Sequence, residues 1–489
     1  MIVPFLGQEY KHNSKAVSPQ ETINLIPELV DDVNAKSKYI LVGTPATDLF
    51  ANATSTTVGI TRGLHYSSKS VLYAVFGELL VRITPLGGYA TMGNIGSPLS
   101  TDSVSIADNG EYLIVADGQK MWSLKLDTEV FDEVDLTNCD IENPTQVVWL
   151  NNRMVAIGDN ANTYFWSNNG DPLTWTGLDF NSANSSADTI ISIDKRQNEL
   201  WLFGKQSYEV HAITRDADLP FSYRGGSASE IGCGAVNSVA QINENLFWFG
   251  SNRAGSGQVF MSSSGYSAQR ISTLAIENEI SKIQNNSLMT TEDIKGFTYS
   301  QAGHTFYVMT FKSGNLTYVY DTTTNQWHRR TTRNATKNVL DKWEPTFAVF
   351  AYDQVVCGSD SSARLFTLDL EKYEEYDGRP IVRKRIGPIY WSALQEAIFD
   401  SFVLDLETGV GLTSGQGSDP LCMIRLSHDG GYTWGNQFTR SIGKLGNYGA
   451  VVRLNGLGSS RKLAIEVSIS DPVKVVMLNA NLEYEEVGL

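Results

Sequence analysis

The chain has 489 residues, of which 42% are hydrophobic and 19% are charged, and its formal net charge is −16. These values are typical of a folded protein that is long enough for one large domain with additional segments. The acidic balance argues against general nucleic-acid binding, because phosphate contacts need clustered Lys and Arg, but it does not exclude a surface past which DNA slides.

Residues 1–58 do not follow the pattern of the rest of the chain. Apolar and polar residues alternate over residues 22–29, and residues 39–42 form a short apolar run. The Gly-Thr-Pro sequence that follows this run predicts a turn. We therefore predict an N-terminal strand pair that clamps onto the next domain. The opening MIVPFLGQEYKHN lacks the basic flank and apolar length of a signal peptide, and no window approaches ~18 apolar residues, so we expect neither a leader nor a membrane anchor.

Residues 59–372 repeat a strand pattern in which apolar runs are separated by Gly- and Asn-containing turns. A glycine closes the second run of each copy. It recurs at Gly77, Gly118, Gly158, Gly204, Gly250, Gly314 and Gly358. Most intervals are about 40–46 residues, which is the period of a four-stranded β-propeller blade. An ordinary β-rich protein, in which frequent glycines align by chance, is the plain alternative.

The one long interval, between Gly250 and Gly314, is explained by an insertion at residues 273–294. Ile276, Ile280 and Ile283 lie there on one face of a predicted helix. We therefore predict an all-β fold with a β-propeller of seven blades, or six as the alternative.

Two segments near the end of the repeats are rich in Arg and Lys. The residues that we single out for contact with a partner or with DNA phosphate are Arg329, Arg330, Arg333, Arg383, Lys384 and Arg385. A solvated loop, or a contact with an acidic protein face, is the simpler explanation of such a cluster.

From residue 373 to residue 489 the blade pattern stops, and six strand-like runs predict a separate C-terminal β-sandwich or barrel. The motif SHDGGYTW in this part fits the Asp-box pattern of sialidases and other β proteins. Its members are Ser427, Asp429, Gly431, Thr433 and Trp434. We predict a structural hairpin turn in which Asp429 accepts backbone N–H bonds, because sialidases carry several boxes on successive blades and this chain has one.

The sequence offers no recognisable catalytic or metal site. The four cysteines are far apart and the six histidines lack zinc-ligand spacing, so we expect free thiols in a reducing cytoplasm, no metal and no cofactor. No P-loop, nucleophile elbow or dinucleotide fingerprint is present. We therefore expect a protein that is not an enzyme.

Three well-separated regions resemble the packaged-DNA stabilisation proteins of short-tailed phages, also called tail hub or nozzle proteins. SPQETINLIPE is similar to the family's opening, with Asn24, Pro27 and Glu28 in its N-x-x-P-E core. FWSNNGDPLTW resembles the W-S-x-x-G-D-P-x-x-W loop, matched by Trp166, Ser167, Gly170, Asp171, Pro172 and Trp175. ADTIISI…LWLFGKQSYEV is similar to a third pattern, matched by Asp188, Gly204, Ser207 and Glu209. The family's T-P-G turn has Ala46 here in place of the glycine.

This resemblance implies a structural virion component, assembled in the host cytoplasm and located in the tail. Such proteins form a sixfold ring below the portal and its adaptor ring. The ring extends the double-stranded DNA channel, retains the packaged genome, and mounts a needle, plug, fibres or tailspikes. The partners expected from the resemblance are thus copies of the chain itself, the portal and adaptor proteins, and the tail appendages, with no membrane anchoring.

Two rival functions follow from the residues. The Asp-box and ten Trp suggest a glycan-binding or glycan-cleaving propeller, which polysaccharide binding or sugar release would reveal. An intracellular propeller scaffold is the second rival, and a stable monomer would mark it.

Overall fold

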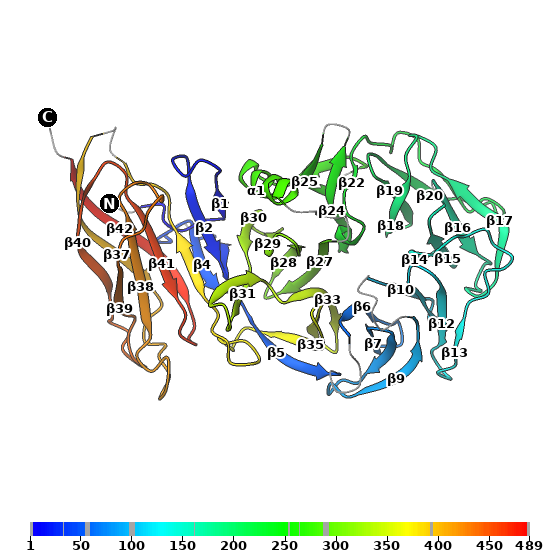
Figure 1. Ribbon diagram of the computed structural model, residues 1–489, viewed down its shortest axis with the longest axis horizontal. Helices are drawn as coiled ribbons and strands as arrows, with labels where there is room; N and C mark the ends of the chain where they lie inside the picture. The colour runs from blue at the N-terminus through cyan, green and yellow to red at the C-terminus, as the bar shows by residue number, and fades with distance from the viewer. Residues whose placement is uncertain are drawn as a thin grey trace.

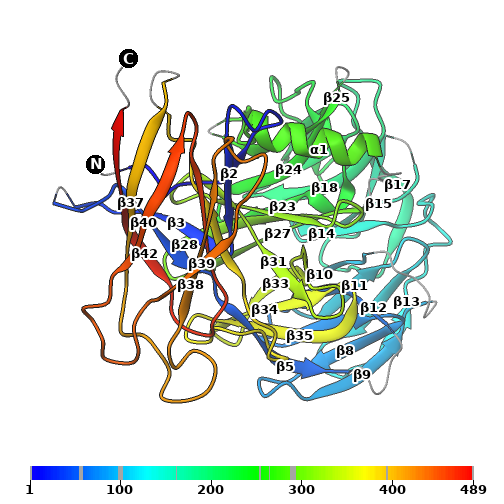
Figure 2. The same cartoon turned by 60° about the vertical axis from the view of Figure 1, so that its left-hand side comes forward.

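The computed structural model describes residues 3–32, 34–53, 59–96, 103–160, 162–252, 255–263, 265–286, 293–391 and 395–486. Two lobes are visible in Figure 1, with a ring of β-sheets at one end and a pair of packed sheets at the other. The N-terminal strands lie between the lobes in both Figure 1 and Figure 2. The chain is therefore an all-β protein, as its sequence predicts.

Seven units of the repeated pattern can be followed among the described residues, and neighbouring strands within each unit pair antiparallel. The first four units comprise β6 (Thr61–Tyr66), β7 (Leu72–Phe76), β8 (Leu79–Ile83) and β9 (Tyr89–Asn94); β10 (Ser105–Asp108), β11 (Tyr112–Ala116), β12 (Met121–Lys125) and β13 (Phe131–Glu133); β14 (Gln146–Leu150), β15 (Arg153–Ile157), β16 (Thr163–Ser167) and β17 (Trp175–Ser182); and β18 (Ile190–Arg196), β19 (Glu199–Gly204), β20 (Tyr208–Ile213) and β21 (Phe221–Tyr223).

The fifth and sixth units carry the insertions. The fifth contains β22 (Gly232–Cys233), the short 3₁₀ helix η1 (Val236–Ser238), β23 (Ala240–Ile242), β24 (Asn245–Asn252), β25 (Gly255–Ser262) and β26 (Ala268–Arg270). Helix α1 (Leu274–Asn286) then leads to the sixth unit, which consists of β27 (Ile294–Gln301), β28 (His304–Phe311), β29 (Leu316–Asp321) and β30 (Gln326–Arg329). Ile276 and Ile280 of the helix are buried against β24, β25 and β28, as their spacing predicts. The end of the predicted insertion, residues 287–292, lies outside the described residues.

The last unit is closed by a strand from the beginning of the chain. A two-stranded hairpin, β31 (Thr331–Asn334) and β32 (Val339–Lys342), precedes β33 (Pro345–Ala351), β34 (Gln354–Ser359) and β35 (Ser362–Asp369). β5 (Ala46–Asn52) then pairs antiparallel with β35, with Ala51 opposite Leu365 and Ala46 opposite Asp369. The final part of the expected N-terminal clamp therefore supplies the outer strand of this sheet.

Five of the seven recurring glycines end or follow a strand, whereas Gly250 and Gly358 lie near the ends of β24 and β34, and the reasons for glycine differ between units. A Cβ atom on Gly158 would lie 1.8 Å from the carbonyl oxygen of Glu142, so the backbone approach there requires glycine. Gly118 has open space around its Cβ position but a φ of +89°, a conformation that side chains rarely adopt. Glycine is thus required in one unit because there is no space for a side chain, and in another because the backbone has a positive φ.

Two sheets packed face to face form the second lobe. One contains β3 (Leu25–Leu29), β4 (Tyr39–Gly43), β42 (Val476–Glu486), β37 (Ala397–Leu406) and β40 (Val452–Ser460). The other contains β36 (Arg383–Ile386), β41 (Ala464–Ile469), β38 (Leu421–Ser427) and β39 (Gln437–Ser441). Their shared core includes Phe402, Ile424 and Val467, together with Val3 and Phe5 from the start of the chain. The N-terminal segment is thus built into this lobe as well.

A single strand joins the two lobes into one continuous sheet. β2 (Pro19–Ile23), which also pairs with β1 (Tyr10–Lys11), lies between β30 of the propeller and β36 of the sandwich. Its pairing with β30 is parallel, at Ile23 and Arg329, and its pairing with β36 is antiparallel. We call this region, where residues 3–25 meet residues 327–331 and 382–386, the junction.

Candidate functional site

Asn24, from the first motif, connects three segments of the junction through hydrogen bonds. It is buried and has a φ of 52°. Its Nδ2 donates to Thr331 Oγ1 at 3.0 Å and to the carbonyl of Val382 at 3.0 Å, while its Oδ1 accepts from the N–H of Thr331 at 2.9 Å. An amide side chain is suited to this role because it donates and accepts at once, and Asn tolerates the left-handed conformation.

The other two residues of that motif lie on β3. Pro27 is buried opposite Leu41, and Glu28 lies 4.0 Å from Nε2 of His304. The Nδ1 atom of that histidine is 2.7 Å from Oδ2 of Asp321, and this hydrogen bond raises the pKa of His304. The N-x-x-P-E core thus connects the N-terminal segment with the sixth unit of the propeller.

The W-S-x-x-G-D-P-x-x-W loop joins β16 to β17 through its own hydrogen bonds. Asp171 Oδ1 accepts from the N–H of Leu173 at 2.9 Å, and Trp175 Nε1 donates to the carbonyl of Pro172 at 3.0 Å. Gly170 has a φ of 77°, and Trp166 and Trp175 are both buried. The motif therefore specifies a turn anchored by two tryptophans.

The third pattern forms a reciprocal pair of carboxylate contacts in the fourth unit. Asp188 Oδ2 accepts from the N–H groups of Gln206 and Ser207 at 2.6 and 2.9 Å. Glu209 accepts from the N–H of Ser185 at 2.8 Å and from His211 Nε2 at 2.7 Å. Burial acts to raise the pKa of Glu209, but the hydrogen bonds from His211 and Ser185 lower it below its usual value. Each carboxylate thus accepts hydrogen bonds from backbone N–H groups close in sequence to the other carboxylate.

Gly204, within the same pattern, leaves room for this contact. A Cβ atom there would lie 2.3 Å from Oδ2 of Asp188. The spacing of the motif therefore has a local structural cause.

The Asp-box is the hairpin turn that its sequence predicts. Asp429 Oδ1 accepts from the N–H groups of Tyr432 and Thr433, each at 2.9 Å, and Oδ2 accepts from Thr433 Oγ1 at 2.6 Å. Burial opposes the shift, but these donors hold the pKa of Asp429 far below its usual range. A Cβ atom on Gly431 would lie 2.7 Å from Pro19, so the turn packs on β2. Trp434 is half-buried, with Arg425 over its ring. The carboxylate is engaged within the turn, so the box gives no support to glycan chemistry.

Three of the six basic residues expected to contact a partner or DNA are buried inside the junction. Arg330 is 1% exposed, and Arg383 and Arg385 have no exposed surface. Arg385 donates to the carbonyls of Phe5 and Gln8 and to Thr22 Oγ1, at 2.7, 3.0 and 2.6 Å. This placement corrects our expectation for these three arginines, because a side chain without exposed surface cannot contact a DNA phosphate from this fold.

Burial also changes the acid–base behaviour of these groups. It lowers the pKa values of Arg383 and Arg385 to about 10, and it raises the pKa of the neighbouring Glu375 although Thr47 donates a hydrogen bond to it. Arg330 stacks on Trp343, with Cζ 3.7 Å from the ring centroid, and donates to the carbonyl of Pro45. Arg330 and Arg385 thus connect segments inside the junction. The guanidinium nitrogens of Arg383 have no hydrogen-bond partner among the described residues, and its Cζ lies 5.9 Å from the centroid of the Tyr373 ring.

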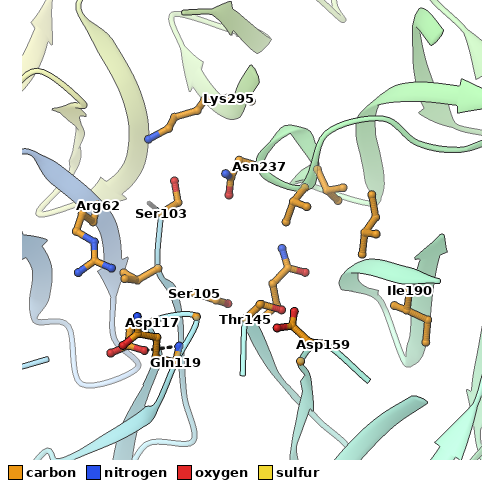
Figure 3. A pocket seen from close by; sticks show the side chains of 18 of the residues that line it. Arg62, Ser103, Ser105, Asp117, Gln119, Thr145, Asp159, Ile190, Asn237 and Lys295 are labelled. Atoms are coloured by element: carbon orange, nitrogen blue, oxygen red, sulfur yellow. Dashed lines mark hydrogen bonds between the residues drawn. The ribbon is translucent and has the colours of Figure 1, made fainter. Parts of the chain in front are cut away.

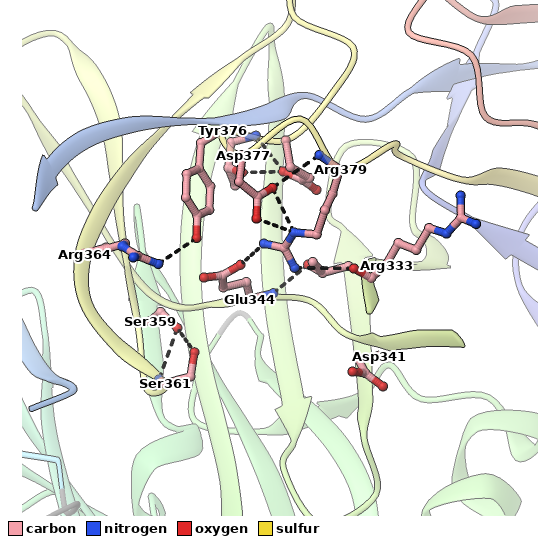
Figure 4. A network of polar contacts seen from close by, with 12 residues as sticks. Arg333, Asp341, Glu344, Ser359, Ser361, Arg364, Tyr376, Asp377 and Arg379 are labelled. Carbon is pink, nitrogen blue, oxygen red and sulfur yellow. Dashed lines mark hydrogen bonds and ion pairs between the residues drawn. The ribbon is translucent and has the colours of Figure 1, made fainter. Parts of the chain in front are cut away.

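The remaining three basic residues also have partners within the chain. Lys384 Nζ lies 2.7 Å from Oε2 of Glu21, which is the strand β2 residue opposite Ile386. Arg329 is half-buried; burial acts to lower its pKa, but Glu9 and other nearby groups together raise it above its usual value. Arg333 donates to Asn338 in its own hairpin and, in Figure 4, points away from the network around Arg379. Of the six, only Arg333 has a side chain directed away from the junction contacts.

The network of Figure 4 connects the last unit with the linker to the sandwich. Arg379 donates to Glu344 at 2.7 Å and pairs with Asp377 at 2.6 Å, and Arg364 donates to the hydroxyl of Tyr376 at 3.0 Å. These contacts hold residues 373–380 against the propeller.

A cavity of about 620 Å³ lies where the first strands of the units converge. Its lining includes Arg62 of β6, Ser105 of β10, Gln146 of β14, Ile190 of β18, Lys295 of β27 and Phe347 of β33. Figure 3 shows the labelled side chains arranged around an open centre. Sequence reasoning missed these residues, because they are far apart in the chain. The signal that could have found them is their shared position on the first strand of each repeated unit.

The described ranges contain neither a membrane-spanning helix nor a metal-binding group. None of the helices there has both the length and the apolar character needed to cross a membrane. Likewise, the described residues contain no group of three or more His, Cys, Asp or Glu placed to hold a metal ion.

The fold and its contacts define a β-propeller protein with an attached β-sandwich, in which the recognisable motifs are structural. Residues 2–373 match a family model described as "Bacteriophage P22 Gp10, beta-propeller", the phage stabilisation family. The match covers well over half of the chain, so the protein belongs to this family. The resemblance to the packaged-DNA stabilisation proteins is thereby confirmed, and so is the predicted β-propeller. The family is one of phage structural proteins. No curated protein matches the sequence.

Solved structures show only a distant likeness. Streptogramin B lyase is 11% identical with a TM-score of 0.43, covering 67% of this chain and 98% of that one. The extracellular domain of the one-component system BT4673 from B. thetaiotaomicron is 10% identical with a TM-score of 0.42, covering 68% and 40%. A chain of the mitotic checkpoint complex is 10% identical with a TM-score of 0.41, covering 71% and 98%. Likenesses at this level carry no argument about function.

Proposed function

We propose that the protein is a tail hub component that assembles as a sixfold ring below a portal–adaptor complex, extends the DNA channel, retains the packaged genome, and mounts a needle, fibres or tailspikes. The observation that carries this proposal is the family match over residues 2–373. A structural role without catalysis, in the virion tail, is part of the same proposal.

The construction of the junction supports a structural role. Hydrogen bonds connect residues separated by 307 positions at Asn24 and by 380 positions at Arg385, and β2 continues one sheet from lobe to lobe. Two lobes fixed in this way present a rigid body, which suits assembly by repeated identical contacts around a closed ring.

The distribution of charge supports an orientation for the ring. Residues 103–182, the second and third units, contain thirteen Asp and Glu but only three Lys and Arg. In Figure 1 these units lie at the end of the molecule opposite the sandwich. We propose that this end faces the DNA, because an acidic wall repels the phosphate backbone and lets it slide.

The ring is tested by measuring the mass of the purified protein alone and with its portal–adaptor complex. Native mass spectrometry across a range of protein concentrations would resolve the stoichiometry. Six copies bound per portal complex are expected. A chain that remains monomeric and does not bind the complex would contradict the proposed function.

The orientation is tested by neutralising exposed acids in the second unit, with Asp132→Asn, Glu133→Gln and Asp135→Asn combined. A matched control combines Asp31→Asn, Asp32→Asn and Glu371→Gln, which are also exposed but lie elsewhere. Virions carrying the first set should eject DNA more slowly than wild type in a dye-release assay, whereas the control set should not. Equal effects of both sets would refute the orientation and leave the ring itself untouched.

A further inference from the structure

The central cavity of the propeller differs in charge from the rest of the molecule. Its charged lining residues are Arg62, Lys205 and Lys295 against Asp117 and Asp159, in a chain whose net charge is −16. Converging polar groups in a cavity of 300–1,000 Å³ are typical of small-ligand sites, and this cavity holds about 620 Å³. The local excess of cations therefore indicates that a ligand of this cavity would be an anion.

The two acids of the cavity are occupied by contacts of their own. Asp117 Oδ1 accepts from the N–H of Gln119 at 2.8 Å, and its Oδ2 accepts from Trp122 Nε1 at 2.8 Å. Asp159 Oδ2 accepts from Asn143 Nδ2 at 2.8 Å. Figure 3 shows the Asp117–Gln119 contact at the edge of the cavity. These carboxylates thus serve their own loops.

The cations are held in the wall at low exposure. Lys295 is 5% exposed, and its Nζ lies 4.5 Å from the centroid of the Phe347 ring, while Arg62 is 2% exposed and donates to the carbonyl of Gly77 at 2.9 Å. Charges in such low-dielectric surroundings act more strongly than charges in water. The positive charges of Lys295 and Arg62 would therefore attract an anion into the cavity.

A buried carboxylate that interacts with Lys295 is shared among lysines. Asp360 lies 2.9 Å from Lys342 Nζ and 3.5 Å from Lys312 Nζ. Burial acts to raise the pKa of Asp360, but Lys342, Lys295 and Lys312 lower it below its usual value. Three lysines around one carboxylate leave this side of the cavity positive.

Neutral donors complete the set. Ser103 Oγ is buried without a hydrogen-bond partner among the described residues, and Asn237 also lines the cavity, as Figure 3 shows. Charge-assisted hydrogen bonds from Lys, together with hydroxyl and amide donors, are the usual means of binding a carboxylate or phosphate.

We propose that the central cavity binds a small oxyanion, a molecule bearing carboxylate or phosphate groups, with Lys295 and Lys205 as the charged contacts and Ser103 and Asn237 as neutral donors. This inference does not depend on the ring or its DNA channel. A DNA phosphodiester carries the same chemistry, and the experiment separates it from a free ion.

The test is calorimetric titration of the full chain with citrate and with inorganic phosphate at constant ionic strength. Lys295→Met keeps the length of the side chain but removes its charge, and about tenfold weaker citrate binding is expected. Lys205→Ala, at an exposed position, should weaken binding by about threefold. The control Lys337→Ala, exposed on the β31–β32 hairpin away from the cavity, should leave it unchanged.

Several results would overturn the assignment. One is that neither probe binds the wild type; another is that Lys337→Ala weakens binding as much as the cavity variants. If Lys295→Met does not fold by circular dichroism, Lys205→Ala and Ser103→Val carry the test in its place. Competition by a short DNA duplex, lost in the cavity variants, would assign the site to DNA phosphate and refute a free oxyanion.

Discussion

The propeller and the junction are stabilised in different ways. In the propeller, strands pair with neighbours close in sequence, except where β5 closes the last unit, and apolar clusters such as that of Tyr164, Trp166 and Leu202 fill the space between adjacent units. In the junction, charged and amide side chains with no exposed surface connect segments more than 300 positions apart. Many small, similar contacts hold the first region, whereas a few specific polar contacts hold the second.

This difference teaches how each region should respond to mutation. An apolar cluster loses part of its packing when one member is truncated. A buried polar network loses more, because every donor that is removed leaves an acceptor unsatisfied. Substitutions in the junction should therefore cost more stability than substitutions at surface turns.

Arg385→Met removes the donors to Phe5, Gln8, Gln20 and Thr22. The free energy of unfolding should fall by about 3–5 kcal/mol, because the buried acceptors lose their partners. Urea unfolding followed by tryptophan fluorescence measures this. The matched control Arg425→Met, whose guanidinium is part-exposed and 3.5 Å from Glu466, should change stability by less than about 1 kcal/mol. Similar losses in both variants would contradict the special role of the junction.

Gly158→Ala tests a close backbone approach within the propeller. The new methyl group would meet the carbonyl of Glu142, so a loss of about 3 kcal/mol is expected. Gly118→Ala meets open space and should lose only about 1 kcal/mol through its positive φ. The thermal midpoints of the two variants provide the comparison, and an equal shift would show that the recurring glycines share one cause.

Glu9→Gln tests the buried acid of the junction. Burial raises the pKa of Glu9 to about 7, although Arg329 acts to lower it, from the ordinary value of 4.5. Because the folded state holds the proton more tightly, stability from this group is full below pH 4.5 and is lost as pH rises towards 7. The variant should therefore gain about 2 kcal/mol relative to wild type between pH 5 and pH 8. Parallel pH profiles of unfolding for the two proteins would exclude this behaviour.

Asp429→Ala tests a local turn at the surface. Its acceptors serve only residues 427–433, so a loss of about 1 kcal/mol confined to the sandwich is expected. Hydrogen exchange, measured by mass spectrometry, should show faster exchange in this turn and unchanged protection in the propeller. Faster exchange throughout the propeller would mean that the Asp-box supports more than its own hairpin.

The local features of this protein could be predicted from its sequence. Alternating apolar runs, turn residues and the recurring glycines define the strands of the propeller, because strand pairing within a unit depends on neighbouring residues. The Asp-box turn and the Asp188–Glu209 contact were also visible as motifs, since each closes within a short stretch of chain. The family resemblance depended on the same local motifs.

The tertiary structure alone decided which charges are buried and where the N-terminal segment lies. Arg383 and Arg385 read as exposed basic residues, yet contacts from residues 5–22 and from β41 cover them. The strand β5 reads as part of a clamp, yet it closes the last sheet of the propeller. The central cavity, too, gathers residues from six first strands. Burial and charge pairing depend on contacts between segments that are hundreds of residues apart in the chain. Local sequence patterns do not indicate such contacts.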